Sequence, residues 1–123
     1  MTTMLLLLGF ASVLFPLKSG KMSWYGEPFH GRLTACGEVF DMNSISVAHK
    51  SLPIGTEVVF FYGDRSVVAV VNDRGPYYED REWDASKALA KELFGEDFDK
   101  GVLEVAYVLT GRRVLRDTMR YNL

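Results

Sequence analysis

Four polar side chains in this sequence stand beside a glycine or at the end of a predicted strand: Glu38, His49, Asp73 and Asp84. Carboxyl and imidazole groups are the side chains that most often give or take a proton in catalysis. Asp73 is the strongest candidate, because it opens the turn 72–76 (Asn-Asp-Arg-Gly-Pro) directly after an apolar run. Turns of this kind place side chains at the rim of a small β domain, where ligands can reach them.

Each candidate also has a purely structural explanation. An aspartate before Arg-Gly-Pro is often a turn former that binds nearby backbone. Glu38 could be a solvated loop charge, and a lone histidine such as His49 is more often packed and satisfied than catalytic. Asp84 is best explained as the N-cap of a short helix, and we expect it to support a site rather than to touch substrate.

The elements that would position these residues are mainly strands. Ranges 56–62 and 66–71 are rich in β-branched and aromatic residues, and Gly63 and Asp64 between them predict a tight hairpin turn. Both runs are almost continuously apolar, which predicts that both faces are covered. A helix is expected after Asp84 with its stop at Gly95, and a last long strand over 101–109. The order predicts a mainly β (α+β) fold, a small barrel with one or two short helices.

The N-terminus is the compositional outlier, because residues 4–17 are almost wholly apolar. This run is too short for a membrane span, which needs about 20 residues. We expect a signal peptide over 1–21, a barrel domain over 22–115 and a tail over 116–123, with a buried N-terminal strand as the alternative to the signal peptide. No cysteine follows the apolar run, so the expectation is a secreted or periplasmic protein without a lipid or membrane anchor.

Composition excludes several classes of protein. The chain has 123 residues, enough for one domain, and a net charge of -2, so the basic surface of a nucleic-acid-binding protein is absent. Its single cysteine, Cys36, cannot form an intrachain disulfide, and with two histidines it makes a zinc site improbable. We expect no metal, no cofactor and a monomer.

Short motifs follow one another in a fixed order between residues 22 and 109. They are 23–26 (Ser-Trp-Tyr-Gly), 29–35 (Phe-His-Gly-Arg-Leu-Thr-Ala), 37–43 (Gly-Glu-Val-Phe-Asp-Met-Asn), 48–56 (Ala-His-Lys-Ser-Leu-Pro-Ile-Gly-Thr), 70–76 (Val-Val-Asn-Asp-Arg-Gly-Pro) and 84–86 (Asp-Ala-Ser). One such motif would be weak, whereas the ordered set is specific. The set resembles the RlpA family (rare lipoprotein A, septal-ring lytic transglycosylases).

The resemblance implies a six-stranded double-psi β-barrel, the fold of expansin and barwin domains. It also implies cleavage of peptidoglycan glycan strands without water, which leaves a 1,6-anhydro-N-acetylmuramic acid end. The matching functional positions are Asp73, Glu38 and His49. Glycosidic cleavage needs an acid that protonates the leaving oxygen, and we assign that role to Asp73, with burial or Glu38 raising its pKa.

The residues expected to bind the sugar rings of the glycan strand are Trp24, Tyr25, His30 and Arg74, although Trp24 and Tyr25 could equally be barrel core. A second hypothesis is a non-catalytic, expansin-like module that binds or loosens the wall. A third is a cysteine peptidase that uses Cys36 and His49. It is disfavoured, because no helix that could activate the thiol is predicted after Cys36.

Overall fold

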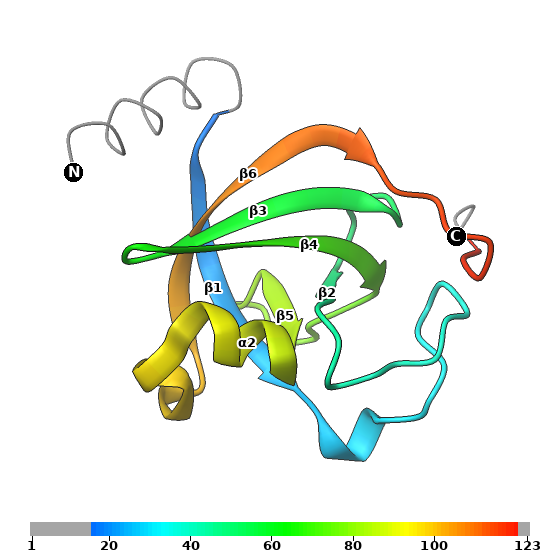
Figure 1. The fold of residues 1–123 in the computed structure, drawn as a ribbon, viewed down its shortest axis with the longest axis horizontal. Helices are drawn as coiled ribbons and strands as arrows, with labels where there is room; N and C mark the ends of the chain where they lie inside the picture. Colours follow the sequence, from blue (N-terminus) through cyan, green and yellow to red (C-terminus); the bar gives the residue numbers. More distant parts are fainter. Residues whose placement is uncertain (1–15, 121–123) are drawn as a thin grey trace.

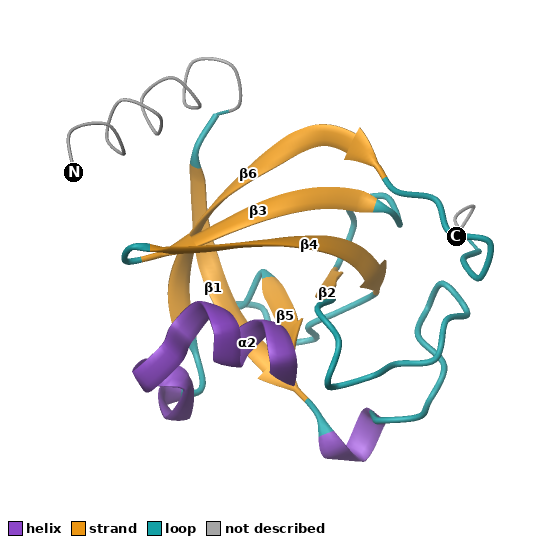
Figure 2. Cartoon of the chain, in the orientation of Figure 1, coloured by secondary structure: helices purple, strands orange, loops and turns teal. Residues whose placement is uncertain are grey.

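A closed β-barrel forms the body of the protein in the computed structural model, which describes residues 16–120 (Figures 1 and 2). Its strands are hydrogen-bonded in the order β1-β5-β2-β4-β3-β6. The elements are β1 (Lys18–Tyr25), β2 (Val47–His49), β3 (Thr56–Tyr62), β4 (Arg65–Asp73), β5 (Trp83–Ser86), α2 (Lys87–Phe94) and β6 (Leu103–Arg113), with 3-10 helices at Glu27–Phe29 and Gly95–Lys100. The predicted six-stranded, mainly β barrel with short helices is confirmed.

The hairpin between β3 and β4 is the most local part of the barrel. The two strands pair antiparallel up to Tyr62 and Arg65, and Gly63 in the turn has a φ of 59°. This confirms the predicted turn, because a two-residue hairpin favours glycine at positive φ. β4 continues to Asp73, beyond the expected end at residue 71, because its last residues pair in parallel with β2.

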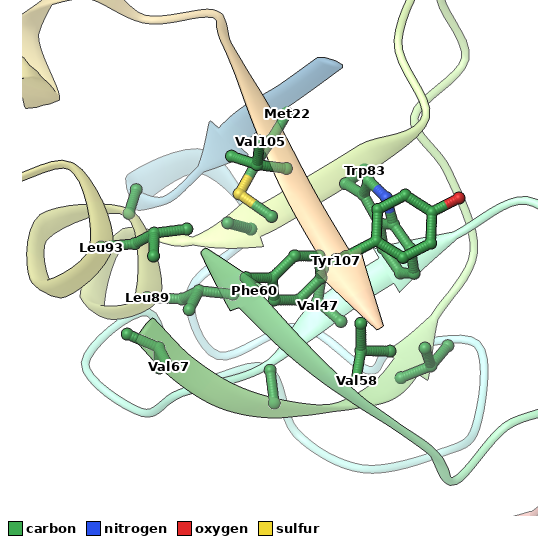
Figure 3. Close-up of a cluster of buried hydrophobic side chains, with 14 of the residues drawn as sticks. Met22, Val47, Val58, Phe60, Val67, Trp83, Leu89, Leu93, Val105 and Tyr107 are labelled. Carbon is green, nitrogen blue, oxygen red and sulfur yellow. The ribbon is translucent and has the colours of Figure 1, made fainter. Parts of the chain in front are cut away.

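The inside of the barrel holds a continuous apolar core (Figure 3). Alternate residues of β3 and β4 point into it, including Val58, Phe60 and Val67. The prediction that both faces of these strands are covered is wrong for β4, where Val68 is 54% exposed. A closed barrel buries its inner face, and helix α2 adds Leu89 and Leu93 to that same inner core (Figure 3).

Helix α2 begins two residues later than predicted. Its N-cap is Ser86, whose hydroxyl accepts a hydrogen bond from the backbone N–H of Leu89 (3.2 Å). The prediction that Asp84 is the cap is wrong, because Asp84 lies inside β5 and pairs with neighbouring strands on both sides. The predicted stop is confirmed: Gly95 is the C-cap, and its N–H donates to the Lys91 carbonyl.

The two ends of the described chain add to the barrel. β1 begins at Lys18, which pairs with Tyr107 of β6, so the first strand starts four residues before residue 22, where we expected the barrel domain to begin. Most of the expected signal peptide lies outside the described residues and stays a prediction. After β6 the segment 114–120 folds back beside the long 31–46 loop, and the backbone N–H of Arg120 donates to the Cys36 carbonyl (2.6 Å; Figure 1). Within residues 16–120, no helix has the length and apolar character needed to cross a bilayer.

Candidate active site

Two aspartates flank one alanine in the middle of the barrel wall. Ala48 of the short strand β2 pairs with Asp73 of β4 on one side and with Asp84 of β5 on the other. Neighbouring strands lie about 4.8 Å apart, so the two aspartate backbones are separated by roughly 10 Å. Both carboxyl groups and Ala48 line one groove of about 610 Å³.

The Asp73 carboxylate is held by three donors. The Tyr25 hydroxyl donates to Oδ2 (3.1 Å), and the backbone N–H groups of Ala35 and Arg74 donate to Oδ1 (2.8 and 2.9 Å). Burial, reinforced by the negative charge of Asp73, raises the pKa of Tyr25 above its ordinary value, so the phenol keeps its proton and remains a donor. The arrangement fixes the orientation of the Asp73 carboxyl group at the end of β4.

Asp84 has a different environment on the neighbouring strand. Its side chain accepts one hydrogen bond from a described residue, from the Ser23 hydroxyl to Oδ1 (3.2 Å). Burial raises the pKa of Asp84 to about 6, and the charge of Asp73 adds to the rise, while Ser23 and the charge of Arg81 oppose it. Half of the Asp84 carboxyl groups therefore carry a proton near pH 6, as a general acid requires.

Glu38 lies in a separate hollow, where the C-terminal segment neutralises it. The Arg116 guanidinium donates to both carboxylate oxygens (2.9 and 2.8 Å), and the Thr118 hydroxyl donates as well (2.6 Å). Hydrogen bonding to Arg116 is the main reason that the pKa of Glu38 falls to about 2. The carboxyl group that shares the groove with Asp73 is thus Asp84 and not Glu38.

His49 points away from the groove toward another hollow of the surface. The backbone N–H groups of Ser51 and Leu52 both donate to its Nδ1 (3.1 Å each), so the proton of the neutral ring is on Nε2 and is donated to Glu82 (3.2 Å). Burial lowers the pKa of His49, which favours the neutral ring further. In this position His49 fixes the loop after β2.

Three of the four residues expected to bind sugar line the groove: Trp24, Tyr25 and Arg74. Arg74 also donates to the Leu52 carbonyl (2.7 Å), which ties the groove to the loop that His49 fixes. His30 is not among the groove residues; it is exposed, and its Nδ1 accepts a hydrogen bond from the backbone of Met42.

The sequence interpretation missed much of the groove wall. The larger side chains that it did not select are Phe29, Leu33, Tyr77, Tyr78 and Arg81. Tyr77 is 88% exposed and Leu33 is 73% exposed, which is unusual for large apolar side chains without a partner. The position of two tyrosines directly after the turn 72–76 was the available signal.

Cys36 is completely buried beneath the loop that carries Glu38. Its thiol lies 3.3 Å from the Thr34 hydroxyl and 3.7 Å from a Glu38 oxygen. In the part of the chain that the structure describes, His49 makes its contacts elsewhere, so the cysteine–histidine pair of a peptidase is not formed. No cluster of three or more metal-binding side chains is present among residues 16–120.

The model of the lytic transglycolase family matches residues 17–107, which include the groove and the whole barrel except the end of β6. The match covers β1 from its first residue and both aspartates.

Relatives of known name support the same family. The endolytic peptidoglycan transglycosylase RlpA of Vibrio cholerae is 49% identical over 78 residues, 62% of this chain and 30% of the relative. The probable endolytic peptidoglycan transglycosylase RlpA of Synechocystis is 42% identical over 85 residues, 68% of this chain and 26% of the relative. The aligned part of this chain thus spans between a quarter and a third of the length of these relatives.

Solved structures share the fold. The Streptomyces papain inhibitor has a TM-score of 0.60 at 25% identity, with 75% of this chain and 92% of that chain covered. An expansin of Clavibacter michiganensis has a TM-score of 0.58 at 20% identity, with 82% of this chain and 51% of that chain covered. The barrel is the expected double-psi β-barrel.

Proposed function

This chain belongs to the lytic transglycolase family, and from that premise we propose that it cleaves the glycan strands of peptidoglycan without water. The product would carry a 1,6-anhydro-N-acetylmuramic acid end. Relatives named as peptidoglycan transglycosylases support this substrate. The observation that carries the proposal is the presence of two carboxyl groups in one groove with opposite environments, one fixed by three donors and one with a raised pKa.

The two environments suggest a division of labour. Asp73 is the acid in the prediction from the sequence, whereas the raised pKa of Asp84 leads us to assign the acid role to Asp84. Its proton would pass to the glycosidic oxygen as the bond from C1 to that oxygen breaks. The 6-hydroxyl of the same sugar then forms the new bond to C1 and gives its proton to the Asp73 carboxylate, which also stabilises the positive charge that develops on the ring. Exchange with solvent restores both groups.

The groove is suited to a sugar polymer in shape and in lining. Phe29, Leu33 and Tyr77 present apolar surface beside the two carboxyl groups, where the faces of pyranose rings can pack. Charged and hydroxyl-bearing side chains, among them Asp73, Asp84 and Arg81, line the same groove and can bind the hydroxyl groups of the sugars. Action on peptidoglycan places the protein in the cell envelope, outside the cytoplasmic membrane.

The test is an analysis of products from purified sacculi by mass spectrometry. We expect fragments with anhydro ends from the unaltered protein, and a loss of about a hundredfold or more in both Asp73→Asn and Asp84→Asn. Asp64→Asn, in the exposed hairpin turn, is the matched control and should cleave normally. Reducing ends in place of anhydro ends would show a hydrolase and contradict the proposal.

A wall-binding module without catalysis is the second candidate, because an expansin shares the fold. It requires that the protein bind sacculi and release no fragments at any pH. The same experiment decides between the two functions, since Asp84→Asn would then leave binding and products unchanged.

A further inference from the structure

Arg81 presents an unsatisfied guanidinium to the groove. Its Nε is buried and has no hydrogen-bond partner among the described residues. Lys21, Lys100, Arg112 and Arg116 each pair with a carboxylate, and Lys50 and Arg65 donate to backbone carbonyls, whereas Arg81 has neither kind of acceptor among residues 16–120. A guanidinium carries five N–H donors, so a half-buried one without an acceptor can receive an anion from outside.

The guanidinium of Arg81 is already held in place. It lies over the ring of Tyr78, 4.3 Å from the ring centroid, and the backbone N–H of Arg81 donates to the Tyr78 carbonyl (3.2 Å). Stacking on an aromatic face restricts the side chain before any ligand arrives, which lowers the entropy lost on binding. Tyr78 and Arg81 both line the groove that contains the two aspartates.

Arg81 also acts on the acid of the proposed reaction. Its positive charge is one of the causes that hold the pKa of Asp84 down against the effect of burial. An anion bound to Arg81 would offset that charge and leave Asp84 better able to keep its proton. Binding of a negatively charged part of the substrate to Arg81 would therefore raise the pKa of Asp84.

We propose that Arg81 is a specificity-determining residue that binds a carboxylate carried by the muramic acid unit of the glycan. The inference rests on the proposed function. Two sources supply this chemistry: the lactyl carboxylate of a unit without a stem peptide, and a carboxylate of the stem peptide itself. A planar guanidinium can donate two parallel hydrogen bonds to either carboxylate. Neutral sugar polymers, such as chitin fragments, lack the group that Arg81 binds.

The test is calorimetric binding in an Asp73→Asn background, which prevents turnover. The probes are a peptide-free peptidoglycan oligosaccharide, the same compound with its lactyl carboxyl groups as methyl esters, a peptide-bearing oligosaccharide and a chitin oligosaccharide of equal length. Arg81→Gln should weaken binding of a carboxylate-bearing probe about tenfold and leave the ester and the chitin fragment unchanged. Arg81→Lys should recover part of the loss. Arg112→Gln, which removes the same charge from an exposed site on β6, should change nothing.

The probes separate the possible outcomes. A loss confined to the peptide-free acid identifies the lactyl carboxylate, and a loss confined to the peptide-bearing probe identifies the stem peptide; both support the inference. An equal loss for the acid and its ester, or no loss for any probe, overturns it while the proposed function stands. Failure of all four probes to bind the Asp73→Asn protein and the unaltered protein overturns the proposed function instead.

Discussion

Asp73 and Asp84 are the same amino acid with different chemistry, and their neighbours make the difference. Asp73 receives hydrogen bonds from Tyr25 and from two backbone N–H groups, which satisfy a negative carboxylate. Asp84 receives one hydrogen bond, from Ser23, and its burial removes most of the water that would stabilise a charged carboxylate. Two carboxyl groups in different environments, one held by its donors and one with a raised pKa, are the usual basis of acid–base catalysis on sugars.

The pH dependence of cleavage follows from Asp84. Because its protonated form is the proposed acid and its pKa is about 6, kcat/KM should fall about tenfold per unit as the pH rises well above 6. The rate at which labelled fragments are released from sacculi, measured between pH 4.5 and 8.5, gives this alkaline limb of the pH profile. Arg81→Gln removes a charge that lowers the pKa of Asp84, so the limb should move to higher pH. A profile that stays flat from pH 6 to 8 would contradict the assignment.

At the scale of elements, the groove depends on two loops that are fixed from behind. The loop after β2 is fastened by the His49 ring, which accepts from Ser51 and Leu52 and donates to Glu82. The loop 34–38 is fastened by Arg116 and Thr118 through Glu38. Both fastenings use residues for which the sequence predicted a catalytic role, and both act at a distance from the two aspartates.

Arg116 is expected to act on catalysis through the loop 34–38. Its removal takes away two of the three hydrogen bonds that the C-terminal segment makes to Glu38, and the loop also carries the Ala35 N–H that donates to Asp73. Arg116→Ala should therefore lower kcat by about tenfold with little change in KM, because a misplaced reacting group costs rate rather than affinity. Arg116→Lys should restore most of kcat. A change in KM alone would show that the segment acts on substrate binding instead.

His49 is expected to stabilise the fold rather than to transfer a proton. His49→Ala leaves two N–H groups without their acceptor and removes one of the two donors to Glu82, so the free energy of unfolding should fall by about 2–3 kcal/mol. Urea denaturation measures the loss. The folded variant should keep the pH profile of cleavage, whereas disappearance of one limb of the profile would give the imidazole a direct role.

How far the sequence predicts these elements depends on how local their causes are. The hairpin of β3 and β4 and the helix stop at Gly95 are set by neighbouring residues, and both were predicted. The strands β2 and β5 have three and four residues, too few for a recognisable pattern, and they exist because of pairing with distant strands. The order of the motifs predicted that Asp73 belongs to the site. Arg116, the partner of Glu38, lies 78 residues away in the sequence, and no local pattern predicts that pair.

At the scale of the whole molecule, core and groove share one strand. In β5 the side chain of Trp83 points into the barrel, where it meets Phe60 and Tyr107 at ring-centroid distances of 4.8 and 4.9 Å (Figure 3). The next residue, Asp84, points to the groove, because successive strand residues face opposite sides. The position of the proposed acid is therefore set by the packing of the largest core side chain.

Trp83→Ala should accordingly affect stability and activity together. Loss of a fully buried tryptophan costs about 3–5 kcal/mol of unfolding free energy. The cavity would also let β5 shift, so residual cleavage below the denaturation midpoint should fall. Val68→Ala, on the exposed face of β4, is the control and should change the unfolding free energy by less than about 0.5 kcal/mol. An unchanged urea midpoint in Trp83→Ala would contradict the role of this core.

Ala48 gives the groove a property that neither aspartate controls. Ala48 lies on the strand between the two carboxyl-bearing strands, lines the groove and is 2% exposed. A bulkier aliphatic side chain at that position would make the trough shallower while both acidic groups keep their own donors. Two properties of the groove therefore depend on different strands. The size of Ala48 on β2 sets how thick a polymer can enter, and the environments of Asp73 on β4 and Asp84 on β5 set the proton transfer.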